Sequence, residues 1–170
     1  MRYPGSLEGL EKSVKEKCCT PERVCTELAE LFGVRRHEVA LLHTQGCLLK
    51  FLFPTELRGV GCVPMSGYGV AARTAQSRKA GVFNDFVQVR HHRFFELIDL
   101  ERNQGDVDPL VIHKMMSAPI VDARGTVLGV IQVSRKGFNG TDAGPDFTRE
   151  DLDSLQSVAR VIARAMPMQA

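Results

Sequence analysis

Cysteines carry the most reactive side chains of this chain, and their spacing bears on disulfide, zinc and thiolate chemistry. The five are Cys18, Cys19, Cys25, Cys47 and Cys62, an odd number in which no CxxC pair occurs. Disulfide frameworks and structural zinc sites both need regular pairs of cysteines, so neither is expected, and the usage indicates a reducing compartment. The first three are better interpreted as small apolar side chains of a core.

Histidines are the other candidates for metal or haem ligation and for proton transfer. His43, His91, His92 and His113 are spread along the chain, and no spacing singles out one of them as a ligand. The sequence also lacks a recognisable Ser-His-Asp set, a phosphate-binding glycine-rich loop and a paired-carboxylate site. The residues themselves therefore predict no catalytic centre and no metal site.

The balance of charge excludes several classes of partner. Lysine and arginine number 22 against 20 acidic residues, for a net charge of +2, whereas a nucleic-acid-binding protein usually carries a concentrated positive field. The local run from Arg90 to Arg93 is interpreted as a solvated loop. No apolar stretch approaches the roughly 20 residues of a membrane helix, and the first six residues do not resemble a signal peptide. We expect a cytoplasmic protein that binds neither nucleic acid nor membrane.

Capping residues and apolar stripes clearly predict two helices. Thr20 is a good N-cap, Pro21 suits the first helical position, and Gly33 ends an apolar stripe. Thr148 and Asp151 form a capping box before the last helix. That helix carries apolar residues three and four apart: Leu152, Leu155, Val158, Ala159, Ile162, Ala163 and Met166. A weaker helix from Ser6 to about Cys18 places three apolar residues at helical spacing: Leu7, Leu10 and Val14.

The middle of the chain has the period of strands. One hairpin, 38–44 and 47–53, turns at Gln45-Gly46, and a second, 115–122 and 126–134, turns at 123–125. Between them the pattern predicts a strand over 60–64, a helix over 68–79, a short strand over 81–84 and an irregular segment over 85–114.

This order of elements predicts an α+β fold with a mainly antiparallel central sheet, because hairpins do not occur in all-parallel sheets. The terminal helices should cover one face of the sheet, and the middle segments should lie on the other face above a cavity. We expect one domain over 1–170, with its core at about 20–166 and an N-terminal helix in 1–19.

Four segments together resemble the GAF domain, a small-molecule-sensing module of cyclic-nucleotide phosphodiesterases, phytochromes and many bacterial regulators. They are VALLHTQGCLLKFLF, VPMSGYGVAARTAQSRKAGVFND, APIVDARGTVLGVIQVSRKG and FTREDLDSLQSVARVIARA, and the pattern runs from Ala40 to Ala165. The resemblance implies a six-stranded antiparallel sheet, a ligand pocket on the face opposite the terminal helices, and dimerisation through those helices.

The branches of this family differ in what they bind, and the sequence bears on each. The cyclic-nucleotide branch has an Asn-Lys, Phe, Asp-Glu signature, which here is the incomplete set Arg135-Lys136, Phe147 and Asp151-Leu152. A cyclic nucleotide therefore stays open as the ligand. A covalent bilin, or the thiolate chemistry of the branch that reduces free methionine sulfoxide, calls for cysteines in the later segments, and no cysteine follows Cys62. With no histidine singled out, haem is not expected either.

The resemblance implies that the ligand binds between the irregular segment and the strands beneath it. Candidate ligand-binding residues are Asn84, Asp85, Arg90, Phe94, Phe95, Ser117 and Gln132. Arg90 is a candidate anchor for an anionic ligand because of its planar guanidinium. Candidate dimerisation residues are Leu7, Leu10, Val14, Leu155 and Ile162.

The expected function is therefore non-catalytic sensing: a small ligand orders the irregular segment, and the terminal helices pass the signal to a partner, with the domain acting as a homodimer. One alternative is a structural dimerisation module without a ligand. Another is a cysteine-dependent free methionine sulfoxide reductase. The sequence names neither the ligand nor the downstream output, and it does not show whether the chain is part of a larger regulator.

Overall fold

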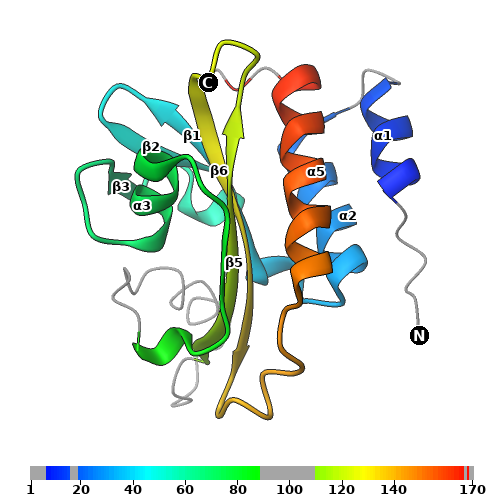
Figure 1. Cartoon of the computed structure of the whole chain (residues 1–170), viewed down its shortest axis with the longest axis vertical. Coiled ribbons are helices and arrows are strands. Elements are labelled where there is room, and N and C mark those ends of the chain that lie inside the picture. Colours follow the sequence, from blue (N-terminus) through cyan, green and yellow to red (C-terminus); the bar gives the residue numbers. More distant parts are fainter. Residues whose placement is uncertain (1–6, 16–18, 89–109, 167, 169–170) are drawn as a thin grey trace.

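A six-stranded sheet runs through the centre of the molecule (Figure 1). The computed structural model describes residues 7–15, 19–88, 110–166 and 168. In sheet order the strands are β3 (Cys62–Pro64), β2 (Leu48–Phe53), β1 (Val39–Gln45), β6 (Val127–Gly137), β5 (Val111–Val121) and β4 (Gly81–Phe83). All neighbouring pairs are antiparallel, so the expected α+β fold with an antiparallel sheet is confirmed.

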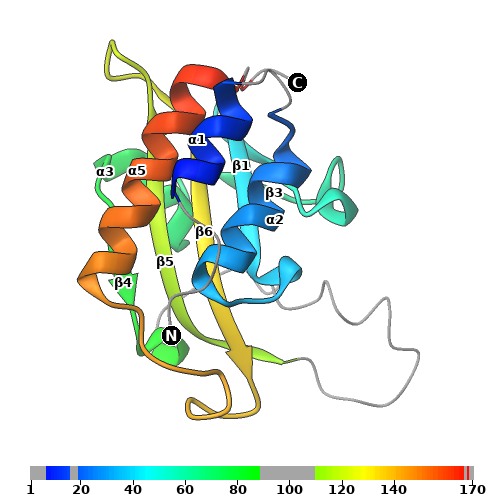
Figure 2. The same ribbon diagram turned by 90° about the vertical axis from the view of Figure 1, so that its right-hand side faces the viewer.

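The helices divide between the two faces of this sheet. Figure 1 shows α1 (Leu7–Lys15), α2 (Pro21–Phe32) and α5 (Arg149–Ala165) on one side and α3 (Val70–Ser77) on the other. Turned by 90°, the same ribbon shows α1, α2 and α5 lying in front of the sheet (Figure 2). We call these two sides the helix face and the α3 face.

The helix boundaries follow from the capping residues. Thr20 accepts a hydrogen bond from the Arg23 amide at 3.3 Å, and Gly33 ends α2 in the left-handed conformation with φ of 60°. At α5, the Asp151 amide donates to Thr148 Oγ1 at 3.1 Å and the Thr148 amide donates to the Asp151 carboxylate at 2.7 Å. The predicted N-caps and capping box are confirmed.

Several predicted boundaries were wrong by a few residues. β5 begins at Val111, so the irregular segment does not extend to 114; the polar pair His113-Lys114 and a register shift between Ile112 and Lys114 hide the strand from a search for apolar runs. Helix α3 is shorter than 68–79 because Arg78 takes a left-handed conformation. The first hairpin turns at residues 46–47, since Gln45 still pairs with Leu48.

Each face of the sheet has its own apolar core. On the helix face, Leu28, Leu155 and Ile162 pack with Ile131 of β6, and all four are fully buried. On the α3 face, Ala72 packs in one cluster with four side chains from other elements, each of them at most 1% exposed. These are Leu42, Phe51, Phe86 and Val130.

The residues proposed for dimerisation contribute to the first of these cores. Leu155 and Ile162 are 0% exposed and Leu10 is 3% exposed, while Leu7 packs partly buried against the same cluster. Val14 belongs to α1, but its side chain lies outside the described part of the chain. Because Leu10, Leu155 and Ile162 already have partners in their own chain, a dimer built on these helices would have to use their outer surfaces.

Among the residues that the structure describes, none of the helices is long and apolar enough to cross a membrane.

Candidate functional site

A small polar cluster lies buried on the α3 face of the sheet. Ser117 of β5 and Gln132 of β6 are direct partners in the antiparallel ladder, which places both side chains on one face. Gln132 Nε2 donates to Ser117 Oγ at 3.2 Å, and Ser117 Oγ shares a hydrogen bond of 2.8 Å with Thr74 Oγ1 of α3. All three residues are at most 4% exposed.

One atom of this cluster lacks a partner. Gln132 Oε1 is buried and accepts no hydrogen bond from the part of the chain that the structure describes. Leaving a buried acceptor unsatisfied costs about 1–3 kcal/mol. The surroundings are apolar, with Met115 and Val130 on the same face of the sheet. The cluster can therefore bind a group that donates a hydrogen bond, and it offers no formal charge of its own.

The sequence predicted two members of the cluster and missed the third. Ser117 and Gln132 were named as ligand-binding candidates, and the structure brings them together. Thr74 was missed, although its signal is visible in the sequence: it is a polar residue at helical spacing from Val70 and Ala71, in the apolar stripe of α3.

Asn84 and Asp85, two further predicted binding residues, are not part of this cluster. Both ends of the Asn84 side chain bond the backbone of Phe147: the Phe147 amide donates to Asn84 Oδ1 at 2.9 Å, and Asn84 Nδ2 donates to the Phe147 carbonyl at 3.0 Å. Asp85 is exposed. Arg90, Phe94 and Phe95 fall outside the described residues, so the structure leaves their role as predicted.

The positions of the incomplete cyclic-nucleotide signature hold the end of the sheet to α2 and α5. Arg135 Nη2 donates to the carbonyl of Phe32 at 3.0 Å, and its guanidinium stacks over the Phe147 ring at 4.7 Å from the centroid. Asp151 closes the capping box of α5, and the Lys136 amide donates to Glu38. Arg135, Phe147 and Asp151 thus have structural partners.

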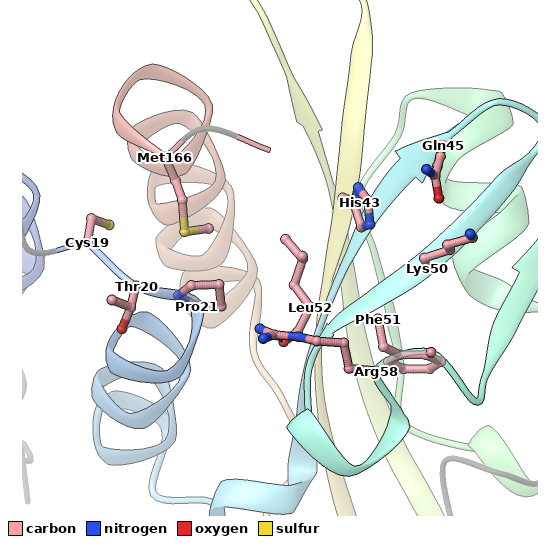
Figure 3. A pocket seen from close by; sticks show the side chains of 11 residues that line it. Cys19, Thr20, Pro21, His43, Gln45, Lys50, Phe51, Leu52, Arg58 and Met166 are labelled. Carbon is pink, nitrogen blue, oxygen red and sulfur yellow. Dashed lines mark hydrogen bonds between the residues drawn. The ribbon is translucent and has the colours of Figure 1, made fainter. Parts of the chain in front are cut away.

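A cavity of about 580 Å³ opens at the helix face, between the start of α2, the end of α5 and the β1–β2 hairpin (Figure 3). It is lined by Cys19, Thr20, Pro21, His43, Gln45, Lys50, Phe51, Leu52, Arg58, Gly59 and Met166. This cavity was not predicted from the sequence, because its walls come from segments that are far apart in the chain.

His43 is the buried polar residue of that cavity, at 4% exposure. Burial lowers the pKa of its imidazole, and the positive charges of Lys50 and Arg58 lower it further, while a hydrogen bond with the Met168 backbone acts in the opposite direction. The net effect is a lowered pKa, so the ring is held neutral near pH 7.

The described cysteines lie away from the polar cluster. Cys25 is fully buried in the core of the helix face, as predicted for a small apolar side chain, and Cys19 is half-buried at the start of α2. Burial raises the pKa of both thiols. Cys47 and Cys62 are exposed, one in the β1–β2 turn and one on the edge strand β3. Among the described residues, no group of three or more His, Cys, Asp or Glu side chains is placed to hold a metal ion.

Most of the chain matches one protein family. The model of the GAF domain family matches residues 22–166. The chain belongs to the GAF domain family. The resemblance read from the hairpins and the closing helix is thereby confirmed. A comparison with curated protein sequences finds no match.

Solved structures of other proteins share this fold. The GAF domain of an Acinetobacter phosphoenolpyruvate-protein phosphotransferase is 13% identical, with a TM-score of 0.62 over 94% of this chain and 90% of that chain. Residues 122 to 287 of a methyl-accepting chemotaxis protein are 14% identical, with a TM-score of 0.66 over 92% of this chain and 94% of that chain.

An enzyme is also among the similar structures. Free methionine-R-sulfoxide reductase from Neisseria meningitidis, solved with its substrate, is 14% identical, with a TM-score of 0.65 over 94% of this chain and 84% of that chain. Likeness at these identities shows a common GAF fold and does not transfer a ligand or an activity.

Proposed function

We propose that this GAF domain is a non-catalytic regulatory domain that binds a small molecule on the α3 face of its sheet. The observation that carries the proposal is the buried Gln132 Oε1, which has no donor among the described residues. A ligand with an N–H or O–H group would satisfy this atom, and apolar neighbours such as Met115 and Phe86 would contact the rest of the molecule.

A route from this site to α5 supports a regulatory role. Ser117 pairs with Gly81 of β4 across the ladder. Asn84, which directly follows β4, bonds both backbone groups of Phe147, and Phe147 precedes the N-cap of α5. A ligand that shifts β5 against β4 would therefore move the start of α5. Such a ligand changes the equilibrium only by its difference in affinity for the two states, typically about 1–3 kcal/mol.

The state of the cysteines supports a role without catalysis. Thiolate attack needs a lowered pKa and an accessible sulfur. Burial raises the pKa of the Cys19 and Cys25 thiols. Within the described part of the chain, Cys47 and Cys62 form no hydrogen bond with Thr74, Ser117 or Gln132. The likeness to a methionine sulfoxide reductase is thus one of fold.

A thermal-shift screen of the whole chain tests the proposal, with free amino acids, cyclic nucleotides and small aromatic acids as the compounds. A ligand that binds only the native state raises the melting temperature. We expect at least one compound to do so in the wild type and to lose this effect in Gln132→Leu, while Gln156→Leu on α5 keeps it. A panel without any shift, or an equal shift in Gln132→Leu, would count against ligand binding at this site.

A further inference from the structure

The cavity on the helix face is separate from the site proposed above, since it lies on the opposite face of the sheet. Its floor is the end of the β1–β2 ladder, where His43 and Lys50 are direct cross-strand partners. Its walls are the start of α2, at Thr20 and Pro21, and Met166, the C-cap of α5 (Figure 3). A volume of about 580 Å³ is within the range of about 300–1,000 Å³ found for small-molecule sites.

The charged groups that line this cavity are basic. Lys50 and Arg58 both belong to the wall, and no acidic residue does. Glu22, from the first turn of α2, lies beside the opening and forms an ion pair with Arg58 Nη2 at 3.2 Å. The same guanidinium nitrogen donates to the carbonyl of Leu52 at 2.9 Å. Arg58 is therefore already held and neutralised by the protein.

Lys50 is the charge that remains uncompensated. Its ammonium makes no hydrogen bond or ion pair within the described part of the chain, although the side chain is half-buried. Next to it, the buried His43 is held neutral and presents an imidazole to the same cavity. The start of α2 adds the positive end of a helix dipole at the wall formed by Thr20 and Pro21.

Apolar groups complete the lining. Leu52 and Met166 are 8% and 5% exposed and face each other across the cavity, from β2 and the end of α5 (Figure 3). An ion alone would leave this surface in contact with water, whereas a molecule with an apolar part would cover it.

We infer that this cavity is a second ligand site, which binds a small organic anion with its charged group at Lys50 and its apolar part against Leu52 and Met166. The anionic group would be a carboxylate or a phosphate, and the Gln45 amide supplies a neutral hydrogen-bond donor beside Lys50. Because Met166 is the C-cap of α5 and Thr20 is the N-cap of α2, an occupied cavity would hold the ends of both helices against the hairpin.

A titration followed by amide chemical shifts tests this inference on the full chain, with benzoate as the probe and benzamide as its neutral counterpart of nearly equal shape. We expect benzoate to give saturable shifts at His43, Lys50 and Thr20, and benzamide to give none. Lys50→Gln should weaken benzoate binding by about tenfold, because a charge-assisted hydrogen bond is lost. Inorganic phosphate should bind more weakly than benzoate, since it covers no apolar surface.

Three control variants separate a ligand contact from damage to the fold. Lys50→Arg keeps the charge and should keep benzoate binding. Lys79→Gln, two residues after the end of α3, should leave it unchanged. Gln132→Leu should also leave it unchanged, because that residue belongs to the other face. Shifts that fail to saturate at millimolar benzoate, equal affinity in Lys50→Gln, or shifts centred on Ser117 and Thr74 would each overturn the inference.

Discussion

The Glu38 carboxylate is buried and accepts three short hydrogen bonds. They come from the Arg35 amide at 2.7 Å, from Arg35 Nη2 at 2.8 Å and from the Lys136 amide at 2.6 Å. Burial acts to raise the pKa of the carboxyl group, but these bonds from Arg35 and Lys136 outweigh it and the pKa is lowered. The ionised form of Glu38 therefore joins the start of β1 to β6.

We predict that Glu38→Gln lowers the free energy of unfolding by about 2 kcal/mol at neutral pH, since bonds to a charged acceptor become bonds to a neutral one. The folded pKa lies below the unfolded value of about 4.3. The stabilisation is therefore complete above that pH and is lost as the pH falls through the folded pKa. Denaturant melts at several pH values should show the two proteins converging in acid, and a constant difference would contradict this account.

His43 gives a pH dependence at higher pH. Its folded pKa is lowered by burial and by the charges of Lys50 and Arg58, so below an unfolded value of about 6.5 the unfolded chain binds the proton more readily. Stability should fall as the pH drops from 7.5 to 5.5, and His43→Gln should remove this part of the loss. Melting temperatures across this range provide the measurement, and parallel curves for the two proteins would show the prediction to be wrong.

At the scale of elements, the Asn84 side chain joins the end of β4 to the residue before the N-cap of α5. Asn84 bonds both the amide and the carbonyl of Phe147, whose side chain is 3% exposed. We predict that Asn84→Ala destabilises the domain by about 2 kcal/mol, because two backbone groups lose their partner. The exposed neighbour Asp85 is the control, and Asp85→Ala should change stability by less than about 0.5 kcal/mol.

Urea unfolding followed by circular dichroism measures both variants. If Asn84→Ala were as stable as Asp85→Ala, the two hydrogen bonds would not hold α5 in place. The coupling route from Ser117 through β4 would then lack its last step.

The sequence predicts some helix and strand boundaries of this fold better than others. Local signals such as the N-cap Thr20 and the capping box at Thr148 predicted helix ends correctly, because capping involves residues within one turn. The hairpins were found from apolar runs. The first residues of β5 were missed because a register shift and the polar side chains of His113 and Lys114 break the alternation there.

The sites were less predictable, because they depend on contacts between distant segments. The pairing of Thr74 with Ser117 joins residues 43 positions apart, and the interaction of Asn84 with Phe147 joins residues 63 positions apart. The spacing of apolar residues within one helix or strand does not predict contacts between such distant residues. Ser117 and Gln132 were found only because the family resemblance indicated which face of the sheet to search.

At the scale of the whole molecule, burial of the helix stripes changes how dimerisation should be tested. Leu155 and Ile162 support the monomer's own core, so Leu155→Asp should unfold the chain instead of separating two copies. The exposed side of α5 carries Arg160 and Arg164. We predict a dimer in sedimentation velocity that Arg160→Glu with Arg164→Glu converts to a folded monomer. A wild-type chain that sediments as a monomer would exclude this homodimer.

A ligand on the α3 face is the central claim, and a crystal structure of the chain bound to a compound from the thermal-shift screen tests it most directly. We predict a donor atom of that compound within about 3 Å of Gln132 Oε1, with Ser117 and Thr74 still hydrogen-bonded to each other. A structure in which a protein donor fills that position and the compound lies elsewhere would contradict it.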